Sequence, residues 1–170
     1  MALMPNQTNN FRIYVDGNLF IGIAEVTLPN CVNQTDELRG GALAGPILVP
    51  VIGHFEDFTL TMTFFAPFPG CEIFLAQESH NIACHSVVQY VDTASGAFSK
   101  LPWNYLFTCT PKEFNPGRLQ QGGKPDMTIA RTVTAYQIFD NNSRVFYADK
   151  MNMICNVDGT DYLEQDRSWL

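Results

Sequence analysis

Alternation of polar and apolar residues with a period of two is the strongest pattern in this chain. Residues 59–64 read TLTMTF, so three threonines share one face while Leu60, Met62 and Phe64 share the other. Successive side chains of a strand point to opposite faces of its sheet. We therefore predict a half-buried strand here, with an apolar face toward a core and a threonine face away from it.

Two segments in the C-terminal third are predicted to form a hairpin. Residues 131–139 (RTVTAYQIF) and 144–148 (RVFYA) are rich in β-branched and aromatic side chains, which favour strands. The residues between them, 140–143 (DNNS), are typical of a tight turn. The arrangement indicates two antiparallel neighbours in a sheet.

A second hairpin is predicted at the N-terminus. Residues 11–15 (FRIYV) precede Asp16-Gly17, a dipeptide that favours a two-residue hairpin turn. Residues 19–28 (LFIGIAEVTL) then read as one partner strand. Pro29 should end that strand, because proline cannot donate a hydrogen bond to the ladder.

Helical spacing of apolar residues is clearest at residues 71–77 (CEIFLAQ), directly after Pro69-Gly70, and predicts a helix there. A short helix or turn is indicated near residues 161–167, and further strands at 87–90 and 106–110. We therefore expect a mainly β fold, an antiparallel β-sandwich or barrel with one flanking α-helix.

One stretch fits neither a buried turn nor a free linker. Residues 28–45 read LPNCVNQTDELRGGALAG, in which Asp36, Glu37 and Arg39 stand between apolar flanks. We predict one domain over residues 1–170, with a protruding loop at about 30–45.

Composition narrows the class of protein. The 170 residues, 46% of them hydrophobic, are enough for one globular domain with a real core. Charged residues are only 16%, which suggests that neighbouring subunits cover much of the surface. Ten basic and seventeen acidic residues give a net charge of −7, which argues against a nucleic-acid clamp.

Targeting signals are lacking in the residues present. No apolar run approaches the roughly 18 residues that span a bilayer. The start, MALMPNQTNN, has neither the basic beginning nor the apolar stretch of a signal peptide. We expect the five cysteines to be free thiols in a reducing cytoplasm.

Candidate chemistry is sparse. His80, Cys84 and His85 cluster in HNIACHS, but no companion C-x-x-C or H-x-x-x-H completes a metal site. The alternative is two polar residues and a buried thiol. No G-x-S-x-G elbow and no pair of carboxylates with divergent settings is present. We predict no catalytic residues, no metal and no cofactor.

Glycine-rich stretches have a conformational interpretation. Gly40-Gly41 is not followed by the Lys-Ser/Thr of a phosphate-binding loop, so these glycines more simply permit a turn. Residues 112–124 (KEFNPGRLQQGGK) are interpreted as a solvated loop between two strands, with a subunit contact as the alternative.

The N-terminal segment IYVDGNLFIGIAEVTLPNCVNQTDELRGG carries a resemblance to a known family. It resembles the major tail tube proteins of contractile-tailed phages and R-type tailocins. The shared positions are Asp16-Gly17, Phe20, Gly22, Thr27-Leu28-Pro29, Glu37, Leu38, Arg39 and Gly40-Gly41. The segments VTAYQI, RVFYAD and NVDGTDYLEQDRSWL are similar to the C-terminal half of that family. Residues 65–102 match poorly.

The resemblance implies a structural virion protein rather than an enzyme. Proteins of this family form hexameric rings that stack, and each subunit adds antiparallel strands to one inner β-barrel. The channel carries the tape-measure protein and then DNA, and a sheath surrounds the tube. Further implied partners are the baseplate and tail terminator proteins. The implied location is the virion tail, assembled in the cytoplasm of a host bacterium, with no membrane involved.

Two sets of residues receive roles under this hypothesis. The threonine faces suit a water-filled channel, the alternative being an outer face in solvent; the candidates are Thr59, Thr61, Thr63, Thr132 and Thr134. The charged loop suits a contact between rings, the alternative being a solvated loop. Its residues are Gln34, Thr35, Asp36, Glu37, Leu38, Arg39, Gly40 and Gly41.

Net acidity fits the same hypothesis. A negative or neutral lumen would let DNA pass without sticking, and a negative exterior would attract a basic sheath interior. The competing functions are a haemolysin-coregulated tube protein of type VI secretion and a non-enzymatic β-sandwich that binds a ligand such as a sugar. The D-G and R-G-G stretches favour the phage or tailocin branch.

Overall fold

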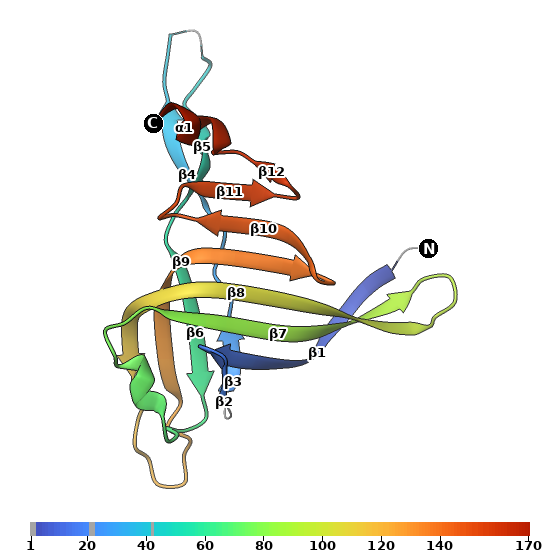
Figure 1. Ribbon diagram of the computed structural model, residues 1–170, viewed down its shortest axis with the longest axis vertical. Helices are drawn as coiled ribbons and strands as arrows, with labels where there is room; N and C mark the ends of the chain where they lie inside the picture. The colour runs from blue at the N-terminus through green and yellow to red at the C-terminus, as the bar shows by residue number, and fades with distance from the viewer. Residues whose placement is uncertain (1–2, 21–22, 42) are drawn as a thin grey trace.

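The computed structural model describes residues 3–20, 23–41 and 43–170, and it is built almost entirely from antiparallel strands (Figure 1). The strands are β1 (Leu3–Val15), β2 (Asn18–Phe20), β3 (Ile23–Thr27), β4 (Asn33–Leu38), β5 (Ile47–Phe55), β6 (Phe58–Phe64), β7 (His80–Asp92), β8 (Phe98–Asn115), β9 (Met127–Asp140), β10 (Ser143–Asp149), β11 (Ile154–Val157) and β12 (Thr160–Asp161). A 3₁₀ helix covers Cys71–Phe74, and the short helix α1 (Glu164–Trp169) lies near the C-terminus.

The larger sheet has the order β12-β11-β10-β9-β8-β7-β1-β2. Strand β9 is shared by two neighbours on one side: its first half pairs with β6 and its second half with β10. Strand β3 continues the sheet beyond β6. The long strands β8 and β9 curve between these two regions, which gives the sandwich-like arrangement in Figure 1.

The core lies on the apolar face of β6, as the period-two pattern predicts. Phe58, Leu60, Met62 and Phe64 are all fully buried, while the intervening threonines are half-buried on the other face. Burial of side chains of this size is worth about 1.5–3 kcal/mol each. The other core residues come from β1, β7, β8 and β9 and include Ile13, Val15, Ile82, Phe107, Ile129, Val133 and Tyr136.

The N-terminal hairpin forms, and among the described residues of the predicted partner strand it is residues 19 and 20 that pair with β1. Asp16 (φ 48°) and Gly17 (φ 83°) adopt the positive φ values that a two-residue hairpin turn requires. Residues 19–28 are not one partner strand: β2 pairs with β1, whereas β3 pairs with β6. The prediction that residues 19–28 pair with residues 11–15 throughout is wrong, because local alternation does not specify which neighbour a strand joins.

The helix predicted at residues 71–77 is also wrong. The segment makes one 3₁₀ turn of four residues after Gly70 (φ 95°), which has no side chain to cap the helix. Phe74 packs into the core, and the chain then enters β7 at His80. The α-helix occurs instead within the C-terminal stretch where a short helix or turn is indicated.

The predicted protruding loop at about 30–45 contains the first strand of a hairpin. Residues 33–38 form β4, which pairs with β5 in a separate two-stranded sheet. We call residues 33–55 the hairpin arm. Figure 1 shows it beside β11 and α1, with its connecting loop extending past α1 at the end of the molecule. Strand β8 runs through residues 112–115, so the loop predicted over 112–124 starts at residue 116, four residues later than predicted.

Candidate assembly interfaces

The candidate threonines of β6 and β9 share one face of the sheet. Thr59 lies opposite Thr132, and Thr61 and Thr63 lie opposite Ala130 and Thr128. Directly opposed residues of an antiparallel pair point to the same face. Because the alternate residues of β6 are in the core, this threonine face is the one directed away from it.

The fifth candidate sits at an irregularity. Thr134 falls where the β8–β9 register shifts, between the Ala135–Thr108 and Val133–Cys109 pairs. Its hydroxyl donates a hydrogen bond to the Thr108 carbonyl (3.2 Å), so this side chain links β9 to β8. The Thr59 hydroxyl is engaged as well: it donates to the Asp57 carboxylate (3.3 Å) and accepts a hydrogen bond from Lys112 (2.7 Å).

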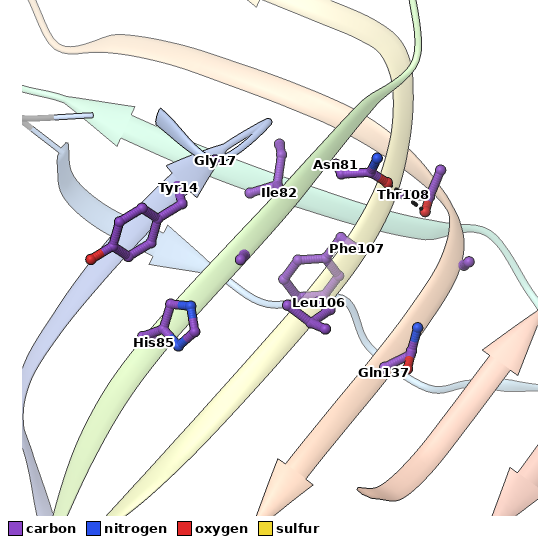
Figure 2. A pocket seen from close by; sticks show the side chains of 11 residues that line it. Tyr14, Gly17, Asn81, Ile82, His85, Leu106, Phe107, Thr108 and Gln137 are labelled. Carbon is purple, nitrogen blue, oxygen red and sulfur yellow. Dashed lines mark hydrogen bonds between the residues drawn. The ribbon is translucent and has the colours of Figure 1, made fainter. Parts of the chain in front are cut away.

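The face continues over β7 and β8 as a shallow groove of about 430 Å³. Figure 2 shows Tyr14, His85, Leu106, Thr108 and Gln137 on this surface, with a hydrogen bond from Thr108 to the Asn81 side chain (3.0 Å). None of the described residues that line the groove is Asp, Glu, Lys or Arg. The groove is therefore lined by mixed apolar and polar side chains without a carboxylate, lysine or arginine.

The charged residues of the hairpin arm interact mainly with one another. The Arg39 guanidinium donates to the Glu37 carboxylate (2.7 Å), and Asp36 accepts from the Glu37 backbone N–H (2.8 Å). Every residue from Gln34 to Gly41 is exposed. An exposed ion pair of this kind contributes about 0–1 kcal/mol to folding, so the folded subunit gains little from it.

Exposed apolar residues on the arm were missed by the sequence reasoning, although ILVPVI at 47–52 carries the signal. Leu48 is 69% exposed and Ile52 is 67% exposed, and Leu38, Ile47, Val49 and Val51 are exposed as well. An isolated two-stranded hairpin is marginally stable in water, and soluble monomers rarely expose contiguous apolar patches of this kind. The arm therefore has the character of an interface element.

A long sheet edge is also open. Strand β1 pairs with β7 along its length, but β2 covers its other side only at residues 13–15. Among the described strands, none pairs with residues 3–12 on that side. Open edges of this length invite pairing with another chain.

The His80, Cys84 and His85 cluster does not converge. His80 and Cys84 point inward from β7, whereas His85 lies on the groove face. His80 Nδ1 contacts the Asp16 carboxylate at 2.6 Å, and burial raises the pKa of the Cys84 thiol to about 12. All five cysteines are free, and no group of three or more His, Cys, Asp or Glu side chains in the described residues is placed to hold a metal.

Comparison with known proteins identifies the family. A family model described as phage tail tube protein FII matches residues 5–170. This chain belongs to the phage tail tube family. Its members are structural components of the virion tail and are not enzymes. Gly22, one of the positions that carry the sequence resemblance, and Ala42, which follows the two glycines, lie outside the described residues.

Two curated relatives are similar over almost their whole length. The tail tube protein of Escherichia phage P2 is 24% identical over 169 residues, covering 96% of each chain. The major tail tube protein of Serratia phage KSP20 is 24% identical over 157 residues, covering 92% of this chain and 90% of the relative.

Solved structures agree on the fold. A sheath/tube terminator of the extracellular contractile injection system PVC matches 79% of this chain and 96% of its own (TM-score 0.55, 15% identity). A chain of the PVC sheath–tube complex matches 76% of this chain and 88% of its own (TM-score 0.52, 15% identity). No helix in the described part of this tail tube protein is long and apolar enough to cross a membrane.

Proposed function

We propose that this protein builds the inner tube of a contractile tail, as hexameric rings of one-domain subunits that stack along the tail axis. The observation that carries the proposal is the tail tube family match over residues 5–170. The fold shared with a chain of a solved sheath–tube complex supports it. A contact repeated by rotation closes a ring, and a contact repeated along the axis makes a tube.

Lateral contacts within a ring use the unpaired edge of β1. Residues 3–12 carry free backbone N–H and C=O groups on the side away from β7, as far as the described strands go. A strand of the next subunit would satisfy these groups and remove the aggregation hazard of an open edge. Such pairing joins the strands of successive subunits into one inner β-barrel.

Stacking between rings uses the hairpin arm. Its contact residues are Gln34, Thr35, Asp36, Glu37, Leu38, Arg39, Gly40 and Gly41, joined by the exposed apolar side chains of β5. Apolar burial supplies the affinity of the contact, and the charges at its rim supply register more than affinity.

The threonine face lines the channel. Thr59, Thr61, Thr63 and Thr132 lie on the side away from the core, with Thr134 at its margin, and the adjoining groove carries no fixed charge. Lys112 contacts this face: it donates to the Thr59 hydroxyl (2.7 Å) and is paired with the Asp57 carboxylate (2.8 Å). A hydroxyl surface whose contacting lysine is already paired, on a subunit with net charge −7, offers phosphates little to bind. The tape-measure protein before injection, and DNA during it, would pass without sticking.

The outer surface of the tube meets the sheath. Residues 158–170 carry Asp158, Asp161, Glu164 and Asp166 against a single cation, Arg167. A negative patch of this kind attracts a basic partner, which suits the inner side of a sheath. The tube ends would contact the baseplate and the tail terminator.

Electron microscopy of the purified protein over a range of concentration and salt tests the proposal. Rings or hollow tubes are expected. A protein that stays monomeric under every condition, also with sheath and tape-measure partners present, would contradict it and favour a ligand-binding sandwich.

A further inference from the structure

The hairpin arm is bent close to the body of the subunit. Asn33 pairs with Phe55, but the next pair is Thr35 with Pro50. Residues 51–54 therefore oppose only Gln34, and an irregularity of this kind bends a strand and increases its twist. Between the two sheets, the most extensive contact of the described strands is that of β5 with β11, beside this bend.

Gly53 stands at the bend with no room for a side chain. Its φ of 74° lies in the left-handed region, and a Cβ built on it would be 2.6 Å from Leu163 Cγ. Leu163 is only 4% exposed. The backbone of the arm thus rests directly on this leucine, an approach that only glycine permits.

Leu163 is itself held by an ion pair. Asp161 accepts the backbone N–H of Leu163 (3.1 Å) and binds the Arg167 guanidinium (2.6 Å). Arg167 also donates to the Met153 carbonyl (2.6 Å), which ties the start of β11 to α1. The position of Leu163 is therefore fixed by the contacts of Asp161 and Arg167 in the C-terminal segment.

Within the bend, the His54 ring contacts the Ile52 carbonyl through Nδ1 (2.9 Å), and the other contacts lie at its base. A cleft of about 190 Å³ lies between the base of the arm and the body, lined by Gly53, His54, Lys150, Met153 and Leu163 among others. Lys150 donates to the Glu56 carbonyl just after β5, and Phe55 packs against Phe146 (5.9 Å between ring centroids). These contacts anchor the chain after the bend but not the arm beyond it.

We propose that Leu163 is a positioning residue that sets the angle of the hairpin arm, and that the Asp161–Arg167 pair holds it there. The C-terminal segment is then part of the stacking machinery although it lies outside the predicted contact residues. The inference rests on the proposed function, because the arm's angle matters only if the arm contacts the next ring.

The first test compares Leu163→Ala, Leu163→Met and Trp169→Ala in the full chain. Methionine refills the space under Gly53, and Trp169, 76% exposed on α1, serves as the matched control in the same segment. If the truncation leaves one arm in ten correctly placed, the protein concentration needed for tubes rises about tenfold. We expect that rise for Leu163→Ala, with Leu163→Met and Trp169→Ala close to wild type. Equal critical concentrations for all three variants would overturn the proposal.

A double-mutant comparison isolates the contact itself. Gly53→Ala introduces a Cβ against Leu163, whereas in the Leu163→Ala background that clash is absent and only the backbone strain remains. We expect Gly53→Ala to raise the critical concentration by a larger factor in the wild-type background. Equal factors in both backgrounds would overturn the proposal, and thermal melts check that each variant is folded.

A third measurement separates this inference from the proposed function. Spin labels carried on unnatural amino acids at Thr35 in the arm and Ser143 in the body report the arm's angle in unassembled subunits. The distance distribution should be narrow in wild type and in Trp169→Ala, and broad in Leu163→Ala. An unchanged distribution refutes the positioning role even if tubes form. A broadened one supports that role even if the wild-type protein makes no tubes and the proposed function fails.

Discussion

The imidazole of His80, at the start of β7, donates a hydrogen bond from Nδ1 to the Asp16 carboxylate at 2.6 Å. Asp16 also accepts the Asn81 backbone N–H (2.9 Å). The turn of the first hairpin is thereby fastened to a strand more than sixty residues away in the chain.

The Asp16 contacts predict a pH-dependent stability. The hydrogen bond from the Asn81 backbone, and then the one from His80, lower the pKa of Asp16 below its ordinary value of 3.8. A carboxyl whose folded pKa is lowered stabilises the fold above its unfolded pKa, and this contribution is lost as the pH falls through the folded value. Because the Asp16 side chain is 39% exposed, solvent screens this effect, and urea unfolding of wild type and Asp16→Asn should differ by up to about 1 kcal/mol at pH 6. The difference should shrink below pH 4, and a constant difference would contradict this explanation.

We expect Arg131→Lys to lower the free energy of unfolding although it keeps the positive charge. The guanidinium is 1% exposed and donates to the backbone carbonyls of Phe74 (3.3 Å) and Glu78 (3.0 Å), which closes the segment between β6 and β7 over the core. Lysine has one nitrogen and cannot reach both carbonyls in the same fork geometry. Losing one hydrogen bond to a charged group should cost Arg131→Lys about 1.5–3 kcal/mol in the free energy of unfolding. Chemical denaturation measures this, with the exposed Arg118→Lys as control.

These long-range contacts show where the sequence stops being informative. The buried face of β6 and the β9–β10 hairpin follow from alternation and turn chemistry, which are local. The division of residues 19–28 between two neighbours depends on pairing across the whole sheet. Residues 71–77 have helical apolar spacing, but the buried side chain of Phe74 packs on the core from a 3₁₀ turn. The periodic pattern cannot distinguish such a turn from an α-helix.

The candidate interfaces were predictable to different degrees. Alternation alone places Thr59, Thr61 and Thr63 on one face, and the register adds Thr132 to it. The charges of residues 34–39 mark an unusual segment but do not reveal the exposed apolar strand β5 beside it. The contact between Gly53 and Leu163 joins residues 110 positions apart and leaves no signal in either local sequence.

Removing the arm's charges should impair stacking without unfolding the subunit. Asp36→Ala, Glu37→Ala and Arg39→Ala together delete an exposed pair that is worth about 0–1 kcal/mol to the fold. Thermal melting should therefore change little, while electron microscopy should show fewer and shorter tubes. Glu72→Ala changes the net charge by the same amount at a site outside the arm and should behave as wild type. Tubes of normal length and yield from the triple variant would remove these residues from the ring-to-ring contact.

If the threonine face lines the channel, a cysteine introduced on it should be shielded from bulky reagents in assembled tubes. In a background with Cys31→Ser and Cys71→Ser, Thr61→Cys places a thiol on the proposed channel surface and Thr160→Cys places one on the exposed strand β12. A small maleimide should label both thiols. A maleimide on a polymer wider than the channel should label only Thr160→Cys, because the tube wall shields Thr61→Cys from outside. In unassembled subunits the polymer should reach both, since Thr61 is only half-buried there. Polymer labelling of Thr61→Cys at the same rate in tubes and free subunits would place the threonine face on the exterior instead, leaving the uncharged groove beside it without a role in DNA passage.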